Sequence, residues 1–138
     1  MVQLVLGLKG SGKTKRLIEM VNAALQEESG DVVVIEKDKK LTFDIPYQAR
    51  LVFASDYSIG TVEFFKGLLS GLHAGNYDIT HIFIDNFVKM MPGVTEEEIE
   101  GFLKWLDEFS RLQNVKFTVS MTLDPDAVSE KIREYMIY

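Results

Sequence analysis

Cysteine is absent from this chain of 138 residues, and histidine occurs only at positions 73 and 81. The lack of cysteine excludes a disulfide framework and a thiolate zinc site. Two scattered histidines are too few for a metal site built on imidazole ligands. No apolar run approaches the ~20 residues of a membrane-spanning helix. A glycine-rich motif that begins at Gly7 leaves no room for a signal peptide. We therefore expect a cytoplasmic protein without a membrane span.

Positive charge is scarce relative to negative charge, with 15 Lys and Arg residues against 21 Asp and Glu and a formal net charge of −6. This imbalance argues against broad binding to nucleic-acid backbones, and the alternative is a local basic groove. Hydrophobic residues make up 46% of the chain and charged residues 26%, which is typical of globular proteins. The length fits one domain over residues 1–138 with a core of adequate size.

Short apolar runs alternate with longer stretches in which apolar residues recur at helical spacing. The runs predict strands at 2–6, 32–36, 50–55, 80–85 and 115–121. The stretches predict helices at 14–29, 61–74, 95–110 and 124–135. This alternation predicts an α/β fold with three αβα layers and a mostly parallel five-stranded sheet. Ligands of such sheets bind at the carboxyl ends of the strands.

Several residues mark the expected ends of the helices. Gly30 is expected just beyond the first helix, where a left-handed residue ends many helices. Thr95 and Glu98 have the spacing of a capping box. Asp124 and Pro125 suit the first two positions of the last helix.

Two apolar segments lie outside these elements, and each has two interpretations. The segment 87–91 is a predicted loop whose Phe87, Met90 and Met91 either pack on the core or form a contact surface that responds to a bound nucleotide. The tail Tyr135–Tyr138 either adds a short edge strand or docks on a neighbouring molecule.

The segment Gly7–Thr14, GLKGSGKT, matches the pattern G-x-x-x-x-G-K-[ST] at every fixed position and lies between an expected strand and an expected helix. Polyphosphate requires converging backbone N–H groups, which a glycine-rich loop supplies without Cβ clashes. The amino end of the following helix adds about half a positive charge. The pattern predicts nucleotide binding, and the alternative is a glycine-rich turn that matches by chance.

Within this motif, Lys13 is expected to contact the β- and γ-phosphates, and the Thr14 hydroxyl is expected to coordinate Mg²⁺. Lys9 and Lys15 add positive charge beside them, although a solvated loop position is the alternative for Lys9. The expected nucleotide-binding residues are Gly7, Lys9, Gly10, Ser11, Gly12, Lys13, Thr14 and Lys15.

With this motif and the strand HIFID that ends at Asp85, the chain resembles the P-loop NTPase superfamily over most of its length. The resemblance implies that Asp85 holds Mg²⁺ through water, whereas the alternative is a turn residue at a strand end. The element order is similar to the RecA-like branch, and most similar to the ATP-binding core of type II thymidine kinase. That family has a glutamate where this chain has Asn86, and it has a cysteine-bound zinc and a nucleoside-enclosing lasso that this chain lacks. Thymidine kinase activity is therefore not implied.

Asn86 determines what we expect of hydrolysis. Together with Lys13 and Asp85 it is a catalytic candidate, but it can only orient a water molecule and cannot accept its proton. Losing a general base lowers a rate by about 10²- to 10⁴-fold. Other carboxylates could substitute, although each also fits a cap or a surface charge: Glu36, Asp38, Asp56, Glu63 and Asp124. Ser120 or Thr122 could contact the γ-phosphate or could satisfy the backbone.

These features predict a protein that binds Mg²⁺ and ATP and hydrolyses ATP slowly, or faster when stimulated by a protein partner or by a second copy of the chain. The lack of an [NT]KxD guanine motif favours ATP. Two alternatives remain. One is a module that does not hydrolyse nucleotide but uses it to order residues 86–95 and recruit a partner. The other is a phosphotransferase that acts on a small acceptor.

Overall fold

Five strands form one parallel sheet in the computed structural model of the chain, which describes residues 1–137. The strands are β1 (Val2–Gly7), β2 (Asp31–Glu36), β3 (Arg50–Phe53), β4 (Ile79–Ile84) and β5 (Lys116–Thr122). Their order in the sheet is β1-β5-β4-β2-β3, and every ladder between them is parallel. The predicted five-stranded α/β fold is confirmed, and its sheet is parallel throughout these ladders.

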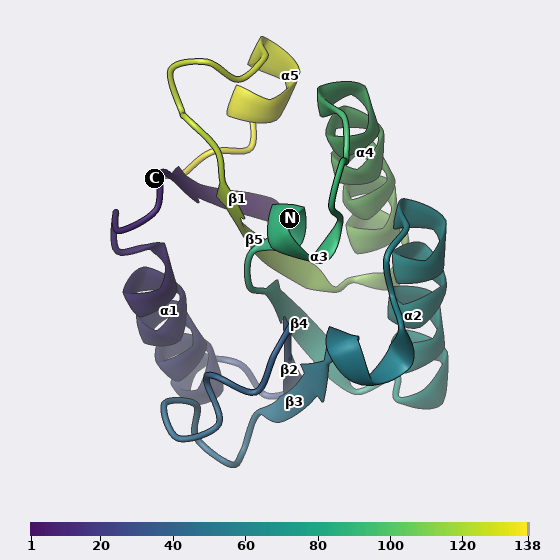
Figure 1. Cartoon of the computed structure of the whole chain (residues 1–138). Coiled ribbons are helices and arrows are strands. Elements are labelled where there is room, and N and C mark those ends of the chain that lie inside the picture. The colour runs from purple at the N-terminus through teal and green to yellow at the C-terminus, as the bar shows by residue number, and fades with distance from the viewer. Residues whose placement is uncertain (138) are drawn as a thin grey trace.

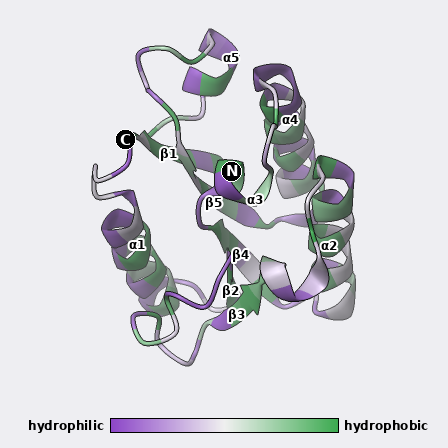
Figure 2. Cartoon of the chain, viewed as in Figure 1, coloured by the Kyte–Doolittle hydropathy of each residue, from purple (hydrophilic) through white to green (hydrophobic). Residues whose placement is uncertain are grey.

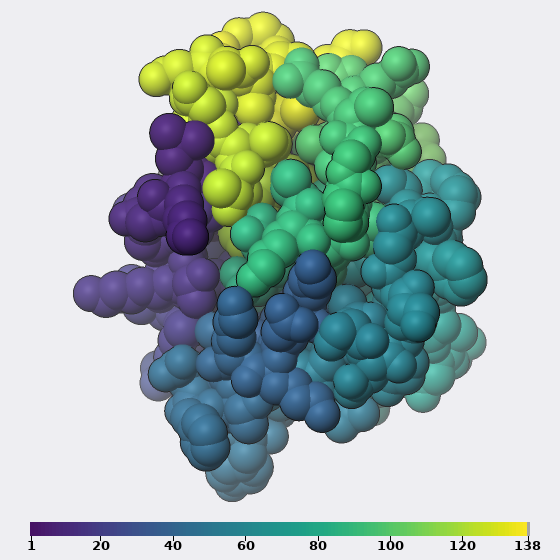
Figure 3. Space-filling model, viewed as in Figure 1, coloured from purple at the N-terminus to yellow at the C-terminus, as the bar shows by residue number. Residues whose placement is uncertain are grey.

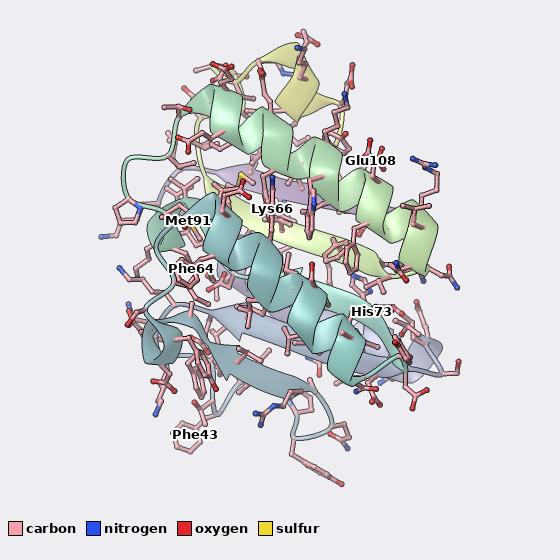
Figure 4. All side chains as sticks on the ribbon, turned by 90° about the vertical axis from the view of Figure 1, so that its right-hand side faces the viewer. Phe43, Phe64, Lys66, His73, Met91 and Glu108 are labelled. Atoms are coloured by element: carbon pink, nitrogen blue, oxygen red, sulfur yellow. The ribbon has the colours of Figure 1, made fainter. Side chains whose placement is uncertain are left out.

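Helices cover both faces of this sheet, as Figure 1 shows. Helix α1 (Lys13–Glu27) lies on one face, and α2 (Val62–Gly75) and α4 (Glu96–Gln113) lie on the other. Figure 4 shows α2 and α4 side by side over the strands. The remaining helices are the single turns α3 (Phe87–Met90) and α5 (Glu130–Arg133). The arrangement has the three predicted layers.

Alternation along the strands divides the apolar residues between two cores. In β2, Val33 and Ile35 belong to the cluster beneath α2 and α4, whereas Val32 and Val34 pack with α1. The loop 41–49, which has no helix or strand, contributes three buried residues to the α1 side: Leu41, Ile45 and Ala49. In Figure 2 the strands are largely in the hydrophobic colour, whereas the helices carry both colours. A strand buried on both faces is a continuous apolar run, as these are.

The predicted helix starts were partly wrong. The capping box of α4 is present, since the N–H of Glu98 donates to Thr95 Oγ1 and the N–H of Thr95 donates to Glu98 Oε1. The last helix, however, begins only at Glu130 with Ser129 as its N-cap. Asp124 instead accepts a hydrogen bond from the N–H of Asp126 at 2.9 Å. A local bond of this kind competes with helix formation.

Gly30 also differs from the expectation. Helix α1 ends at Glu27, and Gly30 does not have the left-handed φ of a helix-ending glycine. Glycine is needed there because the chain passes close to the start of β4. A Cβ on Gly30 would lie 2.1 Å from Thr80 Cγ2 and 2.4 Å from the carbonyl oxygen of Asp78.

The segment 87–91, predicted as a loop, forms the helical turn α3 instead. Phe87, Met90 and Met91 are buried, so the core-packing interpretation is the correct one. The Phe87 ring stacks on Phe102 at a centroid distance of 4.3 Å and meets Phe65 edge-on at 5.6 Å. Aromatic pairs of this geometry contribute about 0.5–1.5 kcal/mol beyond burial, and they fix α3 against α4.

The chain tail adds to the sheet edge, which was one of its two predicted alternatives. The N–H of Leu4 donates to the carbonyl of Tyr135 at 2.8 Å, and the N–H of Ile137 donates to the carbonyl of Leu4 at 2.9 Å. Tyr138 lies outside the described residues. The third strand is shorter than predicted, because residues 54 and 55 belong to a 3-10 turn over Ala54–Tyr57. Within residues 1–137, no helix has both the length and the apolar character needed to cross a membrane.

Replacing Gly30 with alanine will destabilise the protein, because overpacking against Thr80 and Asp78 costs about 1–3 kcal/mol. The matched control is Gly101→Ala, since Gly101 is exposed within α4 and a Cβ there meets no atom within 4 Å. That control should stabilise the helix by about 0.5–1 kcal/mol. Urea unfolding followed by circular dichroism measures both effects. An unchanged midpoint for Gly30→Ala would contradict the close approach.

Candidate functional site

A cavity of about 240 Å³ lies where the carboxyl ends of β1, β2, β4 and β5 meet. Four segments line it: the glycine-rich loop with the start of α1, the segment 36–41, the segment from Asp85 to Lys89, and the end of β5. Figure 3 shows these segments gathered on one side of the molecule. Larger hollows, of about 570, 400 and 380 Å³, lie beside α2, at the amino ends of the strands, and between α2 and the starts of β2 and β3. The smaller cavity contains the residues that the sequence singles out.

Three glycines of the loop, of which Gly7 and Gly12 are fixed in the pattern, each have a geometric reason. Gly10 and Gly12 have φ of 83° and 87°, a left-handed conformation that other residues rarely adopt. A Cβ on Gly7 would lie 2.2 Å from Ser11 Oγ, because the loop folds back over its own beginning. The N–H of Ser11 donates to the carbonyl of Leu8 at 3.1 Å, which closes this turn. The loop therefore has the tight curl that the motif predicts.

The amino end of α1 is arranged to attract an anion. Its N-cap, Gly12, has no side chain to satisfy the free N–H groups, and the first turn contains no acidic residue. The Lys13 ammonium donates to the carbonyl of Leu8 at 3.0 Å and lies 3.5 Å from Ser11 Oγ. Partial burial lowers the pKa of Lys13, and the charge of Asp85 opposes that shift. Lys13 and Asp85 are therefore electrostatic neighbours.

Asp85 follows β4 directly and takes part in a hydrogen-bond network with β5. The Ser120 hydroxyl donates to Asp85 Oδ1 at 3.1 Å and accepts the N–H of Asn86 at 2.8 Å. Burial raises the pKa of Asp85, while the bond from Ser120 and the charges of Lys89 and Lys13 oppose the rise. Burial is the largest of these effects. The hydrogen bond and the lysine charges therefore do not fully offset the cost of removing the ionised carboxylate from water.

The donor set suits Mg²⁺. Thr14 supplies a hydroxyl and Asp85 a carboxylate, both line the same cavity, and Mg²⁺ prefers oxygen ligands. Mg²⁺ is commonly held by one or two protein groups with water and substrate phosphates completing its shell. A cation beside Asp85 would also offset the cost of burying its charge. The residues that are present therefore fit the ion.

Asn86 has a structural task that sequence analysis did not predict. Its side-chain Nδ2 donates to Thr122 Oγ1 at 3.0 Å, and its Oδ1 accepts the N–H of Thr122 at 3.2 Å. Its φ of 56° is left-handed, a conformation that asparagine tolerates better than most residues. The side chain thus ties the end of β4 to the end of β5 and begins α3. Its role in orienting water stays a prediction.

The sequence names Glu36 as one of several carboxylates but does not predict that it lies next to Asp85. It ends β2, and the pairing of Ile35 with Ile84 puts it beside Asp85. Its side chain is buried, lines the cavity and accepts the N–H groups of Lys40 at 2.9 Å and Leu41 at 3.1 Å. Burial raises the pKa of Glu36, and the charge of Asp85 raises it further against those two bonds.

The structure brings most of the predicted residues to the cavity. Six of the ten residues expected to bind nucleotide or metal or to take part in catalysis line it: Lys9, Gly10, Lys13, Thr14, Asp85 and Asn86. Ser120 and Thr122, the candidates for contact with the γ-phosphate, line it as well. Gly7, Ser11 and Gly12 shape the loop without lining the cavity, and Lys15 is exposed on the first turn of α1. Of the substitute carboxylates, Glu36 and Asp38 line the cavity. Asp56, Glu63 and Asp124 do not.

Comparison with known proteins finds no family model and no curated protein that matches the chain.

Replacing Asp85 with asparagine should stabilise the protein by about 1 kcal/mol at neutral pH, as removal of strained site charges often does. The folded-state pKa of Asp85 lies above its unfolded value. At pH values below the unfolded-state pKa, the carboxyl group is protonated in both the folded and the unfolded state and does not lower the free energy of unfolding. As pH rises through the window up to the folded pKa, the parent protein loses stability.

The gain from Asp85→Asn should therefore be full above that window and should vanish below it. Urea unfolding at a series of pH values, with exposed Asp107→Asn as the control, measures the difference. A gain that does not change with pH would contradict the assignment to the Asp85 charge.

Proposed function

We propose that this protein binds a nucleoside triphosphate, ATP, together with Mg²⁺ in the cavity at the carboxyl edge of the sheet, and hydrolyses it slowly. The observation that carries the proposal is that Lys13, Thr14 and Asp85, distant in sequence, line one cavity beside a tightly curled glycine loop. This is the constellation expected of the P-loop NTPase superfamily, which the motif resembles.

In this proposal each group has one task. The loop and the first turn of α1 supply N–H groups to the phosphates. Lys13 neutralises the β- and γ-phosphates, and it exchanges its contact with the carbonyl of Leu8 for contacts with the ligand. Thr14 and Asp85 hold Mg²⁺, which neutralises phosphate charge when it is bound. ATP is favoured over GTP because the chain has no guanine-specific motif. The location that we propose is the cytoplasm.

Hydrolysis requires a group that accepts a proton from water, and we propose Glu36 for this task. It is a carboxylate in the cavity with a raised pKa, the direction that suits a general base near neutral pH. Its oxygens also accept two backbone N–H groups from the segment 40–41. That engagement competes with a water molecule and supports slow turnover. A protein partner or a second copy that shifted this segment would accelerate the reaction.

The two alternative functions differ in their use of the nucleotide. A binding module would hold ATP without turnover and present residues 86–95 to a partner, which the engagement of Asn86 by Thr122 favours. A phosphotransferase would need a second, acceptor-binding site, and only the resemblance to thymidine kinase supports it.

Lys13→Ala should abolish nucleotide binding, because the phosphates lose their mobile cation. At a nucleotide concentration 100 times the dissociation constant, the parent protein should gain about 2.7 kcal/mol of stability. Thermal unfolding with and without Mg-ATP measures this gain. Lys104→Ala, an exposed lysine on α4 away from the cavity, is the control and should keep the full shift. A shift of the same size in Lys13→Ala would count against the proposal.

Glu36→Gln should lower the rate of phosphate release by about 10²- to 10⁴-fold, the usual effect of losing a general base. Binding of Mg-ATP should survive, because the glutamine oxygen can still accept one of the two N–H groups. The control is Asp56→Asn, which removes a carboxylate outside the cavity. If parent and Glu36→Gln release phosphate at equal measurable rates, Glu36 is not the base. If the parent binds ATP and releases none, the binding-module alternative holds.

A further inference from the structure

The cavity concentrates positive charge in an acidic protein. Its lining contains five lysines and three carboxylates, an excess of two positive charges, whereas the whole chain has a net charge of −6. The lysines are Lys9, Lys13, Lys37, Lys40 and Lys89, and no arginine lies among the lining residues. The proposed function gives a role to Lys13 alone, so it does not account for the others.

Lys40 and Lys89 come from two segments that face each other across the cavity. Lys40 lies in the segment after β2, and Lys89 lies on α3, which follows β4. The two strands are neighbours in the sheet, so the segments that leave them are close together. Figure 3 shows the dark blue segment after β2 against the green segment of α3. We call these two residues the lysine pair.

The backbone at both positions is held in place. The N–H of Lys40 donates to the buried Glu36 carboxylate at 2.9 Å. The N–H of Lys89 donates to the carbonyl of Asn86 at 3.1 Å, and the Asn86 side chain is itself bonded to Thr122. On the other side of α3, Phe87 is fully buried. The side chains of the lysine pair therefore extend into the cavity from backbone positions that are fixed by hydrogen bonds.

Lys40 and Lys89 line the same cavity and approach each other, and the charge of Asp38 only partly offsets the effect of this contact on Lys89. Contact with Lys40 is the main cause that lowers the pKa of Lys89, ahead of burial. Within residues 1–137, neither lysine forms an ion pair within 4.0 Å. The adjacent Lys39, in contrast, pairs with Asp56 at 4.0 Å and lies over the Phe53 ring. Two facing ammonium groups repel each other, and an anion between them would relieve that repulsion.

Building on the proposed function, we propose that the lysine pair binds the terminal phosphate of the nucleoside triphosphate and makes the site selective for triphosphate over diphosphate. Lys13 follows β1, and the lysine pair follows β2 and β4 on the other side of β5, so the cations approach the phosphate chain from two sides. The terminal phosphate adds about one negative charge to the magnesium complex, and hydrogen bonds between ammonium and phosphate are among the stronger ones.

The same arrangement favours release of the product. Once the terminal phosphate has left, the ammonium groups of Lys40 and Lys89 face each other with no anion between them. Diphosphate then gains nothing from the lysine pair and dissociates more easily than triphosphate does.

Calorimetric titration with Mg²⁺ and either the β,γ-imido analogue of ATP or ADP tests this selectivity. Lys89→Gln and Lys40→Gln should each weaken binding of the triphosphate analogue about tenfold and change that of ADP by less than about twofold. Lys89→Arg, which retains the charge, should preserve most of the selectivity. Lys104→Gln is the control for loss of one positive charge elsewhere on the surface. Lys40 and Lys89 are exposed, so these variants should fold, which their thermal unfolding verifies.

The unmodified protein gives a second readout, because a rising salt concentration should weaken binding of the triphosphate analogue more than binding of ADP. Equal losses for both nucleotides in the glutamine variants, or no loss, would overturn the role of the lysine pair. The proposed function would then stand as long as binding still depended on Lys13. If the parent protein binds neither nucleotide, the proposed function fails and this inference fails with it.

Discussion

The partial burial of the Asp85 carboxylate is the constraint on which the candidate site depends. A carboxylate withdrawn from water is costly unless hydrogen-bond donors and cations surround it. The protein supplies the Ser120 hydroxyl and the nearby charges of Lys89, Lys13 and Lys40, yet burial still outweighs them. Lys13 and Lys89 are themselves partly desolvated, and Lys89 lies close to Lys40. The site thus holds charges of both signs that the fold alone does not satisfy, and such a site is expected where a charged ligand completes the arrangement.

The strand order explains how these charges come together. Because β5 lies between β1 and β4, its hydroxyl groups fall between the glycine loop and Asp85. From this position Ser120 and Thr122 form hydrogen bonds with Asp85 and Asn86, the two residues that lie between β4 and α3. These bonds fix the start of α3. On the other side of β4, β2 contributes Glu36 and the segment with Lys40. A parallel sheet thus brings residues that are distant in sequence together at the carboxyl ends of its strands.

The parts of the site that the sequence predicts are those whose requirements are local. Gly10 and Gly12 need a left-handed backbone, and the apolar run before Gly7 needs to be a strand, so the motif alone predicts loop and helix. Glu36 depends instead on which strands are neighbours, and no local pattern encodes that β2 lies beside β4. The last helix was predicted too long because Asp124 bonds within its own turn, which resembles an N-cap in sequence. Gly30 was misinterpreted because close approach to Thr80 is a tertiary contact.

The contact between the chain tail and Leu4 has a consequence for self-association. An uncovered outer strand exposes unpaired backbone groups, and such strands promote the growth of intermolecular β-structure. The bonds of Leu4 to Tyr135 and Ile137 occupy part of the outer side of β1. The opposite border is β3, which is only four residues long and begins with the charged Arg50. Truncation before Tyr135 would leave β1 open to pairing with another molecule, so these few residues protect the protein against polymerisation.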